Sequence, residues 1–132
     1  MVRIGSLLLL MTIAACAGGG TPVGPTSTEL RVANATSEPF AFFAVAADLV
    51  PLLDPVLEIS VADPATRLVS PGAEYPVGEI SGRDQAPEGG VALFLYALTP
   101  DRTRVRFAGL QMASGEEIRV AGGRIVVRRV GS

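Results

Sequence analysis

Residues 29–130 alternate short apolar runs with breaks that contain proline and glycine, a pattern typical of short β-strands. Strands are expected at 29–33, 40–47, 57–61, 67–69, 74–80, 91–98 and 102–107. The run at 91–98 is apolar on both faces, which predicts a central strand. Pro76 cannot donate a ladder hydrogen bond, so 74–80 is expected at a sheet edge.

Two connections carry specific local signals. In the sequence Ser70-Pro71-Gly72-Ala73, Pro and Gly occupy the central positions of a four-residue turn, which predicts a type II turn. Residues 46–55 are apolar but contain two prolines, so a single helical turn or a packed crossover loop is expected there. The Leu and Val side chains of this segment are expected to close one end of the core rather than to bind a partner.

The carboxyl-terminal segment suggests a hairpin centred on Gly122-Gly123, because paired glycines suit a two-residue primed turn. That turn fixes the register of the two strands. The predicted cross-strand pairs are Val120 with Ile125, Ile118 with Val127, and Glu117 with Arg128.

About seven short strands in a segment of this size predict an all-β fold, a small antiparallel β-sandwich. In size and strand number it resembles immunoglobulin-like sandwiches. The resemblance is architectural only, because the Cys-Trp-Cys core of true immunoglobulin domains is absent: the chain has no Trp and one Cys.

Composition narrows the range of functions. The 132-residue chain has 11 basic residues against 13 acidic ones, a net charge of −2, which argues against a nucleic-acid partner. The absence of His removes the commonest general base and metal ligand. Adjacent Glu116 and Glu117, read as strand residues, point to opposite faces and so do not form a glycosidase pair. No catalytic residue, cofactor or metal ligand is therefore assigned, and the protein is expected not to be an enzyme.

Two weak candidate sites remain. Arg102, Arg104 and Arg106 alternate along one strand and form a possible interaction surface for anions, although a solvated, aggregation-resistant face explains them more simply. Five acids in or beside turns and loops are candidate calcium ligands, although acids at such positions are more typical of ordinary turn formation: Asp48, Asp54, Asp63, Asp84 and Asp101.

The amino-terminal residues carry the most specific signal. A short segment with one positive charge, Arg3, is followed by an apolar run and by the sequence Ile13-Ala14-Ala15-Cys16. This arrangement resembles bacterial lipoprotein precursors, whose lipobox places an aliphatic and two small residues before an obligatory cysteine. The resemblance implies a signal peptide at 1–15, cleavage before Cys16, and acylation of Cys16.

Two alternatives to lipidation stay open. The first is an uncleaved membrane helix, although the apolar run is shorter than the ~20 residues needed to span a bilayer. The second is an ordinary secretory signal that is cut at Ala17 or later. Ala17, rather than Asp, follows the cysteine, which by the same resemblance points to the outer membrane.

The expected organisation is a signal peptide (1–15), a lipidated Cys16 with a flexible Gly/Pro/Thr linker (16–28), and a β-sandwich domain (29–130). The expected protein is an envelope lipoprotein that is held in the membrane by lipid on Cys16. Its domain faces the periplasm and is a non-enzymatic accessory or protein-interaction domain. Its partners would be the membrane and an unidentified envelope protein. The alternative is a periplasmic or surface module that binds a glycan or a metal ion.

Overall fold

The computed structural model describes Thr26, residues 29–83 and residues 85–131. The predicted signal peptide, Cys16 and most of the linker lie outside the described residues, as does Asp84. Within the predicted linker, Thr26 forms an isolated β-bridge with Gln85, and its carbonyl accepts hydrogen bonds from the backbone of Glu29 and Leu30.

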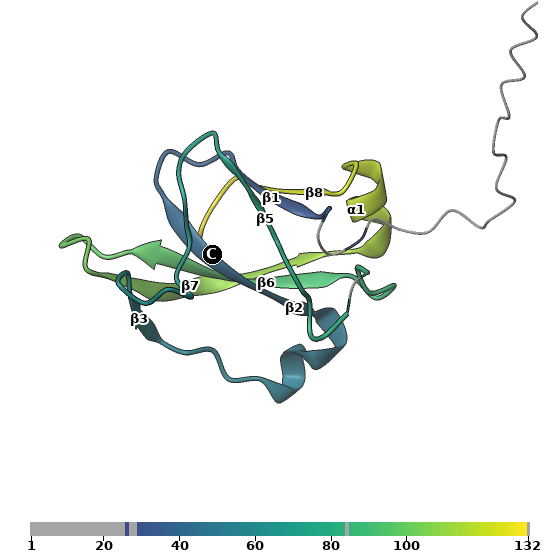
Figure 1. Ribbon diagram of the computed structural model, residues 1–132, viewed down its shortest axis with the longest axis horizontal. Coiled ribbons are helices and arrows are strands. Elements are labelled where there is room, and N and C mark those ends of the chain that lie inside the picture. Colours follow the sequence, from purple (N-terminus) through teal and green to yellow (C-terminus); the bar gives the residue numbers. More distant parts are fainter. Residues whose placement is uncertain (1–25, 27–28, 84, 132) are drawn as a thin grey trace, which may run out of the picture.

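The described residues form a two-layered all-β sandwich, as the sequence predicted (Figure 1). Its strands are β1 (Arg31–Asn34), β2 (Phe40–Ala46), β3 (Glu58–Ser60), β4 (Leu68–Val69), β5 (Glu74–Pro76), β6 (Val91–Leu98), β7 (Arg104–Ala113) and β8 (Arg124–Val127). One sheet has the order β5-β1-β8 and the other β3-β7-β6-β2-β4. All neighbouring strands are antiparallel except β1 and β8, which run parallel.

The predicted positions of two strands are confirmed. β6 lies in the middle of the five-stranded sheet, where its residues Val91 to Tyr96 are buried, and β5 is an edge strand. The expected turn before β5 is also present, because the Ala73 N–H donates to the Ser70 carbonyl at 2.9 Å. Gly72 has a φ of 76°, which a type II turn requires at its third position.

The main core lies between the two sheets. Alternate side chains of β1 and β8 from one sheet meet those of β2 and β6 from the other. Fully or almost fully buried residues from both layers include Val32, Phe40, Leu93 and Ile125.

One buried polar side chain links the two sheets. Asn34 ends β1 and is 2% exposed. Its Nδ2 donates to the carbonyl of Val69 in β4 at 2.7 Å and to that of Glu38 at 2.9 Å. Its Oδ1 accepts from the Thr36 N–H and hydroxyl at 2.8 and 2.6 Å. The amide therefore has partners on both its donor and its acceptor sides, which offsets the cost of burying it.

The expected helical turn is present as the 3-10 helix η1 (Ala47–Leu52). The expectation that its apolar side chains close the core holds only for part of them. Leu49 packs against the core, whereas Leu52 and Leu53 are exposed.

The predicted carboxyl-terminal hairpin is wrong. Residues Gly115–Val120 form the helix α1, and β8 pairs with β1 instead of with residues 117–120. The predicted pairs Val120–Ile125, Ile118–Val127 and Glu117–Arg128 are therefore absent.

Both ends of α1 explain this difference. Ser114 and Glu117 form a capping box at the amino-terminal end. At the other end, Gly122 and Gly123 have φ of 65° and 80°, and their N–H groups donate to the carbonyls of Arg119 and Ile118. This is the Schellman arrangement, so the two glycines end a helix and do not turn a hairpin.

Candidate functional site

A β-bulge in β7 decides which of its side chains face outward. Leu95 of β6 is opposite Gly109, and the next residue, Tyr96, is opposite Phe107, so Ala108 is the extra residue. Before the bulge, Phe107 packs on the outer face of the five-stranded sheet, the face turned away from β1, β5 and β8. The bulge shifts the alternation by one residue, so beyond it Leu110 lies on the same outer face.

Half of β7 has no strand paired to the edge that faces away from β6. β3 pairs with β7 only over Arg104–Arg106, and a last hydrogen bond joins the Phe107 N–H to the Leu57 carbonyl at 2.9 Å. Among the described residues, no strand pairs with this edge beyond that point. We call residues 108–113 the open edge.

The open edge presents the backbone groups of alternate residues. A Cβ added to Gly90 would clash with the Ala113 carbonyl oxygen, so that carbonyl faces β6. Backbone direction alternates along a strand, so Gln111 also faces β6, whereas Leu110 and Met112 direct their N–H and C=O groups away from the sheet. These groups are available to an added strand.

The composition of the open edge differs from that of the other edges. Residues 108–113 contain no charge and no proline, and the side chains of Leu110 and Met112 are 43% and 51% exposed. Three of the other edge strands carry features that discourage pairing: Glu58 in β3, Pro76 in β5 and Arg124 in β8. The open edge lacks the protection that these three edge strands carry.

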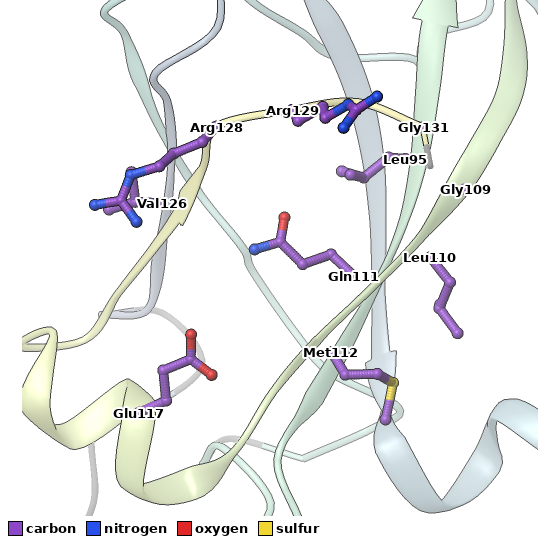
Figure 2. A pocket seen from close by; sticks show the side chains of 10 residues that line it. All are labelled: Leu95, Gly109, Leu110, Gln111, Met112, Glu117, Val126, Arg128, Arg129 and Gly131. Atoms are coloured by element: carbon purple, nitrogen blue, oxygen red, sulfur yellow. The ribbon is translucent and has the colours of Figure 1, made fainter.

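A groove runs between the open edge and β8 and has a volume of about 500 Å³ (Figure 2). Gln111 points into it from β7, and Glu117 points into it from α1. Leu110 and Met112 lie on the opposite side of β7. The strand therefore has a polar side toward the groove and an apolar side toward solvent.

Arg128 and Arg129 add positive charge to the groove. The same two residues line a second hollow of about 530 Å³ beside residues 35–39. The ion pairs in the described residues involve other arginines: Arg83 with Asp48, Arg104 and Arg106 with Glu58, and Arg124 with Glu74. Neither Arg128 nor Arg129 has an ion pair within the described part of the chain.

The predicted arginine row is only partly regular. Arg104 and Arg106 share Glu58 of β3, with N–O distances of 3.7 and 3.8 Å. Arg102 precedes β7 in a turn with a φ of 59° and does not continue the row. A neighbouring acid thus already accompanies two of the three arginines, which leaves them less suited to an outside anion than Arg128 and Arg129.

The acids singled out as calcium candidates do not gather in the described structure. Among the described residues, no group of three or more His, Cys, Asp or Glu side chains lies close enough to hold a metal ion. Asp101 instead organises its turn: its Oδ1 accepts from the Thr99 hydroxyl at 2.6 Å and from the Thr103 N–H at 3.1 Å. These hydrogen bonds stabilise the carboxylate and lower the pKa of Asp101 below its ordinary value, and the one from Thr99 has the largest effect.

Comparisons with protein-family models, with curated proteins and with solved structures found no match to this chain. The case for a functional site therefore rests on its geometry. Within residues 26, 29–83 and 85–131, no helix has the length and apolar character to span a bilayer.

Sequence reasoning missed the open edge and the Arg128–Arg129 pair. A partial signal was present, because residues 108–113 are uncharged and follow the alternating segment 102–107 directly. The hairpin prediction placed Arg128 opposite Glu117 and gave Arg129 no role. Arg128 and Glu117 both line the groove, but they are not a cross-strand pair: Glu117 lies in α1 and Arg128 follows β8.

Proposed function

We propose that this chain is a lipid-anchored envelope protein whose β-sandwich is a non-enzymatic interaction domain that accepts a strand of a partner protein. One observation supports the proposal that the domain accepts a strand. The open edge combines unpaired backbone groups, exposed Leu110 and Met112, and an adjoining groove.

The proposed lipid anchor is supported by the sequence Ile13-Ala14-Ala15-Cys16. Acyl chains on Cys16 would hold the protein in the membrane, and two or more chains make such binding stable. Twelve linker residues, 17–28, reach at most ~40 Å when extended. The domain would then stand in the periplasm near the outer membrane, within reach of other envelope proteins.

Strand addition fits the open edge for energetic and geometric reasons. Backbone hydrogen bonds to Leu110 and Met112 would extend the β3-β7-β6-β2-β4 sheet beyond β7. Apolar side chains of the partner would cover the exposed parts of Leu110 and Met112, at roughly 25 cal/mol per Å² buried. The added strand would also cover the mouth of the groove.

A glycan-binding role is the second candidate, and the groove itself favours it. Gln111, Glu117, Arg128 and Arg129 line a space of about 500 Å³, which suits a small polar ligand. In that case, ligand binding would involve the groove side chains and would not require the backbone of the open edge.

Site-specific photocrosslinking in native membranes tests the proposal. A photoreactive residue at Leu110 should give a discrete adduct, whereas the same probe at Val120 should not. Val120 is a matched control because it is apolar, 84% exposed and not among the residues that line the groove. The adduct should also disappear when Met112→Pro is added, because proline removes an outward N–H. Equal adducts from both positions, or an adduct that survives Met112→Pro in a folded protein, would contradict strand addition.

A further inference from the structure

We infer that the strand accepted by the open edge has alternating apolar and acidic side chains, with its acidic side toward Arg128 and Arg129. This inference rests on the proposed strand addition and names the chemistry of the partner. It follows from the two different environments on either side of β7 at this edge.

Side chains of an added strand would alternate between these two environments. The added backbone would lie ~4.8 Å from β7, and its successive side chains would point to opposite faces of the extended sheet. Those on the outer face would meet Leu110 and Met112, which are both apolar and about half exposed. Those on the other face would enter the groove beside Gln111.

The groove favours a carboxylate. Arg128 and Arg129 line it together with one acidic residue, Glu117, so the residues that line the groove carry one net positive charge. Neither arginine has an ion pair within the described part of the chain, so a partner carboxylate would compete with no existing bridge. Arginine also binds carboxylates in a bidentate geometry that adds specificity.

The charges are ordered along the groove. Arg129 lies toward the end where Gly131 approaches Gly109, and Glu117 lies toward the Met112 end (Figure 2). Gly131 already lies against Gly109, so an acidic side chain is favoured at the next position along the groove, beside Gln111 on its Arg129 side. At the Met112 end, Glu117 favours a neutral or basic one.

The chain itself supplies no such strand from the two obvious sources. Residues 108–113 of a second copy contain no acidic residue, and neither does the predicted linker at 17–28. Pairing between two copies, or with the linker, would leave Arg128 and Arg129 without a carboxylate from the added strand. The charge of the groove thus favours a different protein as the partner.

Fluorescence anisotropy with the purified full chain in detergent tests this inference. The probes are three labelled seven-residue peptides in which Val alternates with Glu, Gln or Lys. We expect the Glu peptide to bind about tenfold more tightly than the Lys peptide, with an affinity that falls as salt increases. In the double variant Arg128→Gln/Arg129→Gln, this preference should shrink to about twofold or less.

A matched double variant controls for the loss of two charges elsewhere. Arg31→Gln/Arg119→Gln removes two exposed arginines that do not line the groove, and it should retain the full preference for the Glu peptide. Salt dependence in the unmodified chain gives a second readout that needs no variant. A Glu preference that is absent, or unchanged in Arg128→Gln/Arg129→Gln, would overturn the inference.

A fourth peptide separates this inference from the proposed function. It repeats the Glu sequence with N-methyl groups on alternate backbone nitrogens along one edge, which removes hydrogen bonds to β7 without changing charge. If the Glu and Gln peptides bind equally and the N-methylated peptide does not bind, strand addition stands and the acidic preference is wrong. If no peptide binds, or N-methylation has no effect, strand addition itself is wrong.

Discussion

Ser114 and Glu117 each satisfy a backbone group of the other at the start of α1. The Ser114 hydroxyl accepts from the Glu117 N–H at 3.0 Å, and the Glu117 carboxylate accepts from the Ser114 N–H at 3.4 Å. This pair turns the chain from β7 into a helix and directs Glu117 toward the groove. The same local contact therefore shapes both the fold and the candidate site.

The contribution of this cap is measurable. Replacing Ser114 by Ala leaves the Glu117 N–H without its side-chain acceptor, so we expect the free energy of unfolding to fall by about 1 kcal/mol. Urea unfolding measures it. Ser37→Ala is the control, because Ser37 is an exposed turn residue, and its effect should stay within about 0.5 kcal/mol. Equal effects of the two changes would show that the cap contributes nothing.

The buried amide of Asn34 should matter more. Asn34→Ala leaves the carbonyl of Val69 and the N–H of Thr36 without their side-chain partner, so a loss of about 2–3 kcal/mol is expected. Asn34→Asp keeps the size but turns a second oxygen toward the carbonyls of Glu38 and Val69, and it should be at least as damaging. Thermal unfolding of both variants checks this, and an Asp variant as stable as the unmodified protein would contradict the hydrogen-bond assignment.

Asp101 should make the turn before β7 sensitive to acid. Its pKa is lower in the folded protein because the Thr99 hydroxyl and the Thr103 N–H stabilise the carboxylate. A lowered pKa contributes stability that is present above the unfolded value, about 3.9, and is lost as pH falls through the folded value. A carboxyl titration followed by NMR should thus give a midpoint below 3.9, with the Thr103 amide shifting in parallel. A midpoint at or above that value would refute the effect.

Lipidation makes a separate prediction about the mature amino terminus. Mass spectrometry of the protein from bacterial membranes should find a chain that begins at Cys16 and carries acyl groups. Cys16→Ser should leave the signal peptide uncleaved by the lipoprotein pathway and remove the acyl mass. A native amino terminus at Met1, or at an unmodified residue after Cys16, would refute the anchor.

Much of the fold was predictable because burial leaves a periodic trace in the sequence. The doubly apolar run of β6 and the Pro-Gly pair before β5 each have one dominant physical explanation. The segment around α1 has two competing explanations, because Ile118 and Val120 also alternate in the manner of a strand. The contacts between Ser114 and Glu117 favour the helix, and their capping pattern is compatible with the alternation of a strand.

The candidate site was less predictable for a different reason. The bulge at Ala108 leaves little hydrophobic signal, because Ala108 and Gly109 are both small. The open edge exists because β3 stops pairing with β7 at Glu58. The length of β3 cannot be predicted from the sequence of β7. Whether Arg128 and Arg129 share a groove likewise depends on how the two sheets pack.

Amide hydrogen exchange at four consecutive residues of β7 tests the open edge most directly. Gly109 and Gln111 direct their N–H groups toward β6, so their amides should exchange slowly in the isolated protein. Leu110 and Met112 direct theirs outward, so these amides should exchange at least about a hundredfold faster, as expected for solvent-exposed groups. Adding the Val/Glu peptide should slow Leu110 and Met112 selectively. Uniform slow exchange at all four amides in the isolated protein would mean that this edge is already covered, and would contradict the account.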